Sequence, residues 1–160
     1  MPAQARLALV LLAALLAACS ARSPTPDALP DAGPPPAAED VLVRALGLVG
    51  TPYRWGGNTP ESGFDCSGLV NYVYRDMADL RLPRTSRDLA AVQGPRIEPQ
   101  RLAAADLVFF GSAGTVTHVG IYVGEGRFVH APSTGGTVRL DHLDSTYWRA
   151  RYSGARRVLR

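Results

Sequence analysis

The sequence lacks lysine, any block of positive charge and any hydrophobic run long enough to span a membrane. All 17 basic residues are arginines, and they are scattered along the 160 residues. The formal net charge of +3 is too small to indicate a nucleic-acid-binding protein, so no nucleic-acid partner is expected. We attribute the use of arginine alone to genome composition and not to function.

The longest apolar run, Leu7 to Ala18, has 12 residues, whereas a transmembrane helix needs roughly 20. This length is typical of the hydrophobic part of a secretory signal. The run ends in Leu16-Ala17-Ala18-Cys19, which resembles the lipobox of bacterial lipoproteins. The resemblance implies cleavage before Cys19, attachment of lipid (including palmitate) to that cysteine, and, with Ser20 next, the periplasmic face of the outer membrane. A soluble secreted protein and a retained signal anchor are the alternatives.

The stretch that follows is rich in proline and poor in residues suited to a core. Residues 20–38 contain six prolines, which predicts a polyproline-like linker. We therefore expect a signal peptide over residues 1–18, a lipidated cysteine with its linker over residues 19–38, and one folded domain over residues 39–160. The chain has no internal repeats, and a monomer is expected.

Within this domain the apolar periodicity changes from helical to strand-like. Helices are expected from Glu39 to about Val49, from Cys66 to about Ala78, and from Thr85 or Ser86 to Val92. Strands are expected at residues 107–110, 117–123 and 127–131, with weaker candidates at 137–140 and 155–159. Helices followed by a run of antiparallel strands indicate an α+β domain.

Cys66 is the only cysteine in the predicted domain, and lipidation of Cys19 would leave it without a disulfide partner. Asp65 is suited to cap the predicted helix, so the helix dipole and free N–H groups would favour a thiolate. An unpaired cysteine in an oxidising, exported compartment indicates a reactive nucleophile. A buried structural cysteine is the alternative.

His118 and His130 lie on two neighbouring predicted strands. If their hairpin loop comprises residues 124–126, the two histidines share one face of the sheet as diagonal neighbours. A loop one residue shorter would place them on opposite faces. Two histidines on one face suit a general base and the group that orients it. Zinc binding is the alternative, but close CxxC or HxxxH pairs are lacking and no metal is expected. His142 is expected in a solvated loop.

Four ordered motifs between residues 41 and 159 resemble the NlpC-type cell-wall cysteine peptidases. They are Pro52-Tyr53-Arg54-Trp55-Gly56-Gly57, Asp65-Cys66-Ser67-Gly68-Leu69-Val70, His118-Val119-Gly120-Ile121-Tyr122-Val123-Gly124 and His130-Ala131. The resemblance implies a papain-like α+β fold with the cysteine helix packed on an antiparallel sheet. It also implies hydrolysis of amide bonds in peptidoglycan stem peptides, often those of D-glutamate and diaminopimelate, without a metal or organic cofactor.

The same resemblance assigns roles to individual residues. Cys66 is implied to be the nucleophile, His118 the general base and His130 the group that orients the base. Tyr53 is implied to line the cleft and to help stabilise the oxyanion.

Asp65 and Ser67 match positions that, in some members of the family, hold the free amino end of the substrate.

Two alternatives remain from other functional classes. One is a wall-binding lipoprotein without turnover, and the other is a thiol acyltransferase or amidase on a related fold.

Overall fold

The structure, a computed structural model, describes residues 35–133 and 135–160. The predicted signal peptide, Cys19 and the linker up to residue 34 lie outside the described residues. Within the described ranges, no helix has both the length and the apolar character needed to cross a membrane.

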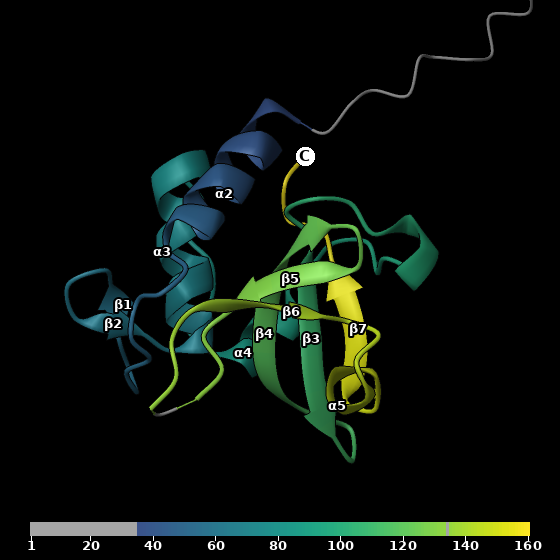
Figure 1. The fold of residues 1–160 in the computed structure, drawn as a ribbon. Helices are drawn as coiled ribbons and strands as arrows, with labels where there is room; N and C mark the ends of the chain where they lie inside the picture. The colour runs from purple at the N-terminus through teal and green to yellow at the C-terminus, as the bar shows by residue number, and fades with distance from the viewer. Residues whose placement is uncertain (1–34, 134) are drawn as a thin grey trace, which may run out of the picture. The chain divides into compact units, whose positions relative to one another are not determined.

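A five-stranded antiparallel sheet forms the centre of the domain (Figure 1). Its strands are β3 (Leu107–Ser112), β4 (Thr115–Gly124), β5 (Arg127–His130), β6 (Arg139–His142) and β7 (Tyr152–Arg156). Their spatial order is β6-β5-β4-β3-β7. Two further short strands, β1 (Asn58–Thr59) and β2 (Gly63–Phe64), pair with each other. The expected α+β class is confirmed.

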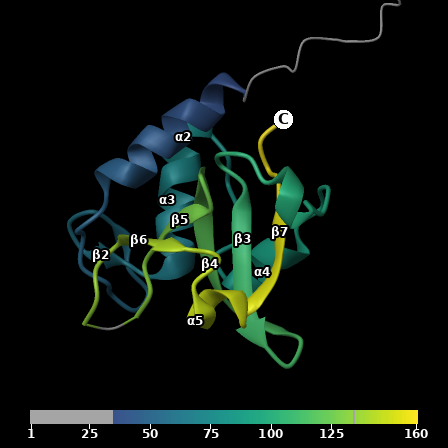
Figure 2. The ribbon, with the colours of Figure 1, turned by 45° about the vertical axis from the view of Figure 1, so that its right-hand side comes forward.

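The helices are α2 (Pro36–Gly47), α3 (Cys66–Ala78), α4 (Ser86–Ala91) and α5 (Thr146–Arg149), with a 3-10 turn at Pro99–Arg101. Helices α2 and α3 lie side by side against one face of the sheet (Figures 1 and 2). There, Leu69 and Val73 of α3 are buried with Val119 and Ile121 of β4. The other face is covered by a smaller cluster that includes Trp148 of α5.

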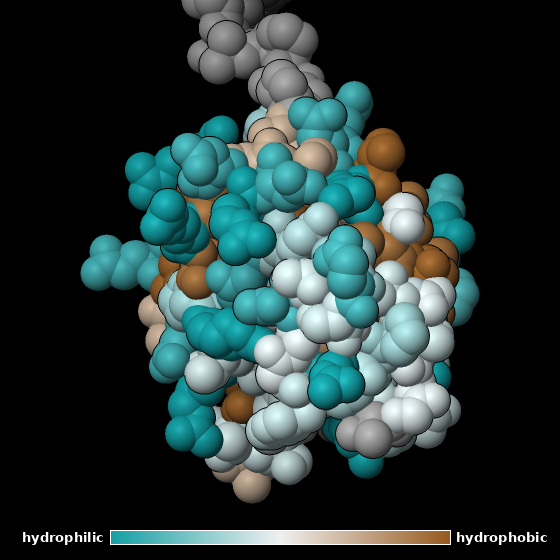
Figure 3. All heavy atoms as spheres, turned by 90° about the vertical axis from the view of Figure 1, so that its left-hand side faces the viewer, coloured by the Kyte–Doolittle hydropathy of each residue, from teal (hydrophilic) through white to brown (hydrophobic). Residues whose placement is uncertain are grey.

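Helix α2 begins at Pro36, three residues before the predicted start of the domain. Its buried residues are Ala38, Val41 and Ala45, followed by Leu48 just beyond the helix, whereas Leu46 and Val49 are 38% and 45% exposed. The core contact therefore extends to Ala38, in the segment that was assigned to the linker. On this side of the molecule, hydrophobic residues form separate small patches within a hydrophilic surface (Figure 3).

The β4–β5 hairpin turns on two residues, 125–126, and not on the predicted three. Gly124 pairs with Arg127, but the strands beyond this pair keep the register expected for the longer loop, Tyr122 with Phe128 and Ile121 with Val129. Val123 has no partner on β5 and forms a bulge, and this extra residue in β4 compensates for the loop being one residue shorter than predicted. The bulge therefore preserves the predicted faces of both strands.

The two weak strand candidates form strands at shifted positions. Strand β6 ends at His142, which is exposed but paired with Arg127 in the sheet, so its placement in a loop was wrong. Most of β6 is exposed, and a strand without a buried face gives no apolar alternation to detect.

Close backbone contacts fix the N-terminal end of α3. A Cβ atom on Gly68 would lie 2.0 Å from the carbonyl oxygen of Gly57, and one on Gly57 would lie 2.3 Å from that of Gly63. Only glycine permits such approaches. They bring the turn at residues 54–57 against the end of the helix that carries Cys66.

Candidate active site

Cys66 is the first residue of α3, and its thiol is half-buried and free. The preceding residue, Asp65, caps the helix as expected, because its Oδ1 accepts a hydrogen bond of 2.7 Å from the backbone N–H of Gly68. The helix continues to Ala78, as the spacing of apolar residues predicts. The thiol is thus held at a helix N-terminus, where backbone N–H groups lack partners within the helix.

A cleft of about 490 Å³ opens beside this thiol. It brings together Cys66, His118, Tyr53, Asp65 and Ser67 from segments far apart in the sequence. The rest of its lining consists of Trp55, Gly56, Arg84, Thr85, Ser86, Thr117, Ala131 and Pro132. Five of the six predicted site residues of the domain therefore share one cleft, and the sixth, His130, lies behind His118.

His118 and His130 are connected, and the connection continues to a carboxylate. His118 Nε2 lies 2.8 Å from His130 Nδ1, and His130 Nε2 lies 2.9 Å from Asp141 Oδ2. The side chains of both histidines are buried, at 9% and 0% exposure. Gly120 leaves the room for this contact, since a Cβ there would lie 2.6 Å from the ring of Phe128 and 3.3 Å from the Cβ of His130.

Asp141 determines which nitrogen of each ring carries the proton when both histidines are neutral. A carboxylate can only accept, so His130 must donate from Nε2, and its Nδ1 is then an acceptor. His118 must therefore donate from Nε2, and its own Nδ1 is left without a proton. His118 lines the cleft, and an unprotonated ring nitrogen is the form required of a general base.

Asp141 is itself held by two further donors. Arg139 Nε and Trp148 Nε1 each donate to Asp141 Oδ2 at 3.0 Å. Burial alone would raise the pKa of Asp141, but hydrogen bonds from Trp148, His130 and Arg139 outweigh it and lower the pKa. The Trp148 ring also stacks on His118, with centroids 5.3 Å apart.

Sequence reasoning missed both Asp141 and Trp148. Asp141 belongs to β6, which was expected to end at residue 140, and Trp148 lies on α5, which was not predicted. The sequence carried one signal for Asp141. Charged residues alternate at Arg139 and Asp141, in the segment that follows the strand ending in His130.

The protonation of the histidines is shifted by their surroundings. Burial, together with the neighbouring His130 and Arg139, lowers the pKa of His118 to about 3 despite Asp141. Burial also lowers the pKa of His130 to about 4, although the hydrogen bond and charge of Asp141 oppose the shift. Both rings are therefore neutral near pH 7.

The surroundings of Cys66 do not favour the thiolate that the helix N-terminus predicted. Burial raises the pKa of Cys66, and the charge of Asp65 adds to this, while backbone N–H groups of Val119, Ser67 and Cys66 lower it by less. Burial depends on the packed fold. The sequence alone therefore could not show whether burial or the helix N-terminus has the larger effect on the pKa of the thiol. At rest, a neutral thiol and a neutral imidazole therefore line the same cleft. Burial and nearby negative charge also raise the pKa of Tyr53, so its phenol remains a donor.

The histidine pKa values predict acid destabilisation. The unfolded chain binds protons on these histidines near pH 6.5, whereas the folded protein resists protonation of His118 and His130 until about pH 3 and 4. Stability should therefore fall as the pH falls from about 6.5, by on the order of 1–2 kcal/mol per histidine near pH 5. Urea unfolding at about pH 7 and pH 5 measures this loss.

Two variants separate the contribution of the buried histidines to this pH dependence from that of other titrating groups. Replacing both buried histidines with glutamine should remove most of the pH dependence in this range, whereas His142→Gln, at an exposed position, should leave it unchanged. An unaltered pH dependence in the double variant would contradict the assignment.

Asp65 and Ser67 line the cleft, but their polar atoms contact Arg84 at 2.8 and 2.6 Å. In the described residues, no three histidine, cysteine, aspartate or glutamate side chains form a group that could hold a metal ion.

The NlpC/P60 family profile matches residues 50–157. Over 126 residues the chain is 46% identical to the murein DD-endopeptidase MepH of Escherichia coli K12, covering 77% of this chain and 46% of MepH. It is 40% identical over 165 residues to the protein named "Probable endopeptidase NlpC" from the same organism, covering 96% of this chain and 99% of that protein. The chain thus spans less than half of MepH.

Solved structures of this family have the same fold. An NlpC/P60 family protein from Bacillus cereus superposes with a TM-score of 0.73 at 32% identity, covering 79% of this chain and 42% of that one. RipD of Mycobacterium tuberculosis, described as a non-catalytic NlpC/p60 domain protein adapted to peptidoglycan binding, superposes with a TM-score of 0.65 at 28% identity, covering 79% of this chain and all of RipD.

Proposed function

The chain belongs to the NlpC/P60 family, and on that basis we propose that it is a cysteine peptidase that hydrolyses amide bonds in peptidoglycan stem peptides. The observation that carries the proposal is the hydrogen-bonded chain of His118, His130 and Asp141 beside a free cysteine in one cleft. The similarity to proteins named as murein endopeptidases supports peptidoglycan as the substrate.

In the proposed reaction His118 acts as the base. Its Nδ1 accepts the thiol proton of Cys66 while the sulfur attacks the carbonyl carbon of the peptide bond. The imidazolium then protonates the leaving amine, and a thioester with Cys66 remains. Water, deprotonated by His118, hydrolyses the thioester and releases a carboxylic acid product.

The neutral resting pair suits this sequence of steps. A thiol with a raised pKa holds its proton until attack, so proton transfer to His118 accompanies formation of the new bond. Negative charge on Asp141 stabilises the imidazolium that forms, transmitted through His130. We assign His130 and Asp141 to positioning and His118 to proton transfer.

Two donors are suited to the oxyanion. The backbone N–H of Cys66 lies in the first turn of α3 and has no partner within the helix. The Tyr53 phenol lines the same cleft and keeps its proton. Donors of this kind stabilise the charge that develops on the carbonyl oxygen in the transition state.

Digestion of purified peptidoglycan tests the proposed function. The protein is expected to release new amino groups and carboxylic acids in equal number from peptidoglycan fragments, and to leave lipid esters intact. Turnover of lipid esters, with peptidoglycan untouched, would favour a thiol acyltransferase or lipid amidase.

A non-catalytic wall-binding protein is the second candidate, and the similarity to RipD is the observation that favours it. The two candidates predict different results in the same digestion. A binding protein would sediment with insoluble peptidoglycan and release no new amino groups from it. The complete connection from Asp141 to His118 beside Cys66 supports catalysis.

The lipobox-like sequence supports a further part of the proposal. We propose that Cys19 carries the lipid anchor and that the domain acts as a monomer from the periplasmic face of the outer membrane. Mass spectrometry of the protein from cell membranes should find Cys19 as a lipidated N-terminal residue, and an unmodified or uncleaved N-terminus would contradict this.

A further inference from the structure

The side chain of Trp148 contacts every member of the hydrogen-bonded chain that runs from Asp141 to His118. Its indole N–H donates to Asp141 Oδ2 at 3.0 Å. Its ring lies nearly parallel to that of His118, with centroids 5.3 Å apart and 22° between the planes, and it meets the ring of His130 at 4.9 Å and 88°. Holding Asp141 requires only the indole N–H. The parallel contact with His118 therefore indicates a second effect, which belongs to the ring.

The fold holds the Trp148 ring in place. Trp148 lies in α5, is 8% exposed, and packs against Phe110 of β3 and Phe128 of β5, with ring centroids 4.8 and 5.4 Å away. Together with the hydrogen bond to Asp141, these contacts fix the plane of the indole. The face that it presents to His118 is therefore in position before any charge forms there.

In the proposed reaction His118 passes through a positively charged form. Burial disfavours that charge and is the largest cause of the low pKa of His118. The face of an aromatic ring attracts a cation within about 6 Å of its centre, most strongly for tryptophan, and the attraction grows where water is excluded. The stack with Trp148 at 5.3 Å meets these conditions, whereas the ring of Phe110 is more distant from His118, at 6.0 Å, and tilted by 40°.

The charged groups of β5, β6 and α3 balance the imidazolium only in part. Asp141 favours it, but acts from beyond His130, and Arg139 beside Asp141 opposes it. The negative charge that Cys66 gains on losing its proton disappears when the sulfur attacks the carbonyl carbon, so it does not balance the imidazolium afterwards. The aromatic contact, in contrast, does not depend on the state of the substrate.

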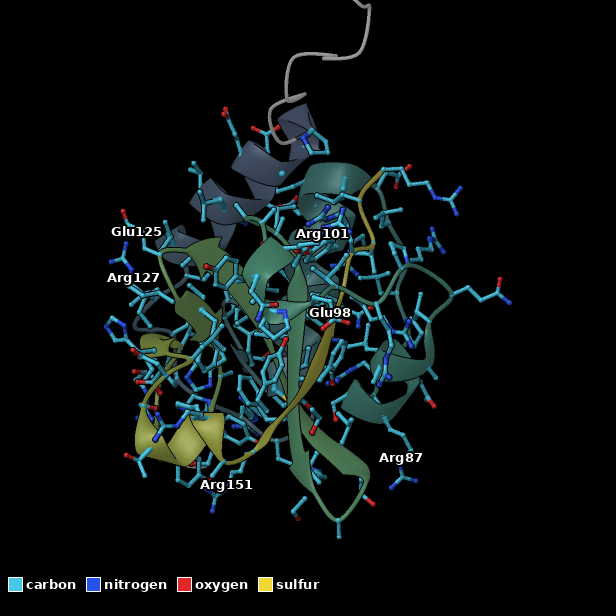
Figure 4. The ribbon with its side chains drawn as sticks, turned by 90° about the vertical axis from the view of Figure 1, so that its right-hand side faces the viewer. Arg87, Glu98, Arg101, Glu125, Arg127 and Arg151 are labelled. Carbon is cyan, nitrogen blue, oxygen red and sulfur yellow. The ribbon has the colours of Figure 1, made fainter. Side chains whose placement is uncertain are left out.

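Charged side chains on the remaining sides of His118 are paired or directed away. Asp65 and Arg84 line the cleft and lie 2.8 Å from each other. Arg151 lines a smaller pocket of about 220 Å³, which His118 shares with α5. Its guanidinium carbon lies 3.7 Å from the ring centre of Tyr147, and the side chain projects outward (Figure 4). These groups leave the stabilisation of the imidazolium to the aromatic contact.

We propose that Trp148 is a positioning residue for this reaction, in which the face of its ring stabilises the imidazolium of His118 while its N–H holds Asp141. The inference rests on the proposed transfer of the Cys66 proton to His118. It assigns two separate effects to one side chain: the ring acts on proton transfer, and the hydrogen bond acts on the orientation of His130. Substitutions can separate them, because phenylalanine keeps a ring face without the donor and leucine lacks both.

Steady-state kinetics on a defined stem peptide, with rates divided by the folded fraction of each protein, tests the inference. Trp148→Phe is expected to lower kcat/KM by less than about fivefold, because a ring face remains and Arg139 still holds Asp141. Trp148→Leu keeps an apolar side chain but has neither ring nor donor. It should lower kcat/KM by about 30-fold or more, the effect of a cation–π contact in a site without water.

Tyr152→Leu is the matched control for lost packing. Tyr152 belongs to the same aromatic cluster as Trp148, but within the described residues its ring pairs with Phe110 alone. Its replacement should lower stability and leave kcat/KM per folded molecule within about twofold of the wild type.

Fluorinated tryptophan tests the ring without changing the fold. Fluorine atoms withdraw electron density from the ring face and weaken its attraction for a cation, while the N–H donor remains. Trp55 and Trp148 are the two tryptophans of the chain, so Trp55→Phe protein carries the analogue at position 148 only. Its kcat/KM should fall stepwise with the number of fluorines, relative to the same variant with ordinary tryptophan.

The rate of Cys66 alkylation by a neutral reagent near pH 7 provides a readout that needs no turnover. If Trp148 only filled space, leucine would admit water to His118, which favours the charged form, and alkylation would stay equal or become faster. Loss of the ring face should instead slow alkylation in Trp148→Leu by about 10-fold or more, and much less in Trp148→Phe.

The outcomes distinguish this inference from the proposed function. Equal losses of kcat/KM in the phenylalanine and leucine variants would overturn it, as would a rate that fluorination leaves unchanged or wild-type alkylation in Trp148→Leu. If the wild type hydrolyses no stem peptide, the proposed function fails. Slow alkylation in Trp148→Leu alone would then still sustain the role of Trp148.

Discussion

Replacing His118 with glutamine is expected to lower kcat/KM for stem-peptide hydrolysis by about 10³-fold, within the range of general acid–base catalysis. Glutamine can keep a hydrogen bond to His130, but it cannot accept the thiol proton of Cys66. Because Cys66 has a raised pKa, the thiol has no other means of becoming nucleophilic near pH 7. Steady-state kinetics on a defined stem peptide measures the loss.

The matched control for this variant is His142→Gln. His142 is exposed at the end of β6, and its replacement should leave kcat/KM within about twofold. The rate of thiol alkylation adds an independent readout, since His118→Gln should also slow alkylation of Cys66 near pH 7. A His118→Gln variant with wild-type turnover would exclude His118 as the base.

Replacing Asp141 with asparagine is expected to lower kcat by about 10²-fold, less than the roughly 10⁴-fold loss in triads where the carboxylate contacts the base itself. An asparagine can present its NH₂ group to His130, which reverses the direction of both hydrogen bonds. Nδ1 of His118 would then carry the proton and could not accept another from Cys66. KM should change by less than about twofold, because Asp141 does not line the cleft.

The pH profile distinguishes this positioning role from a loss of folding. The charge of Asp141 raises the pKa of both histidines against the effect of burial, so its removal should move the acidic limb of kcat/KM to lower pH. Asp144→Asn changes an exposed carboxylate close by in the sequence and should alter neither kcat nor the limb. A lower folded fraction in Asp141→Asn with an unshifted limb would indicate a structural role only.

Local sequence signals predicted the helix that carries Cys66 well. The apolar spacing over Cys66–Ala78 and the cap at Asp65 depend on neighbours within one or two turns, and both predictions are confirmed. The α+β class followed from the same periodicities. The shared face of His118 and His130 was also predicted, although the hairpin reaches it by a two-residue turn and a bulge at Val123.

The remaining features depend on contacts between distant segments. Asp141 joins the site because β6 pairs with β5, and the exposed β6 carries no apolar pattern. The raised pKa of Cys66 reflects burial that only the packed fold creates. Arg84 reaches Asp65 across 19 positions of sequence, so no local motif could have shown this ion pair.

The central claim is that Cys66 cleaves peptide bonds of peptidoglycan, and mass spectrometry of peptidoglycan fragments tests it most directly. Wild-type protein and Cys66→Ala are incubated with the same purified fragments, and both proteins are first shown to be folded. New peptide fragments are expected with the wild type alone, and their masses identify the bond that is cleaved. Equal fragments from Cys66→Ala, or intact fragments in both samples, would contradict it.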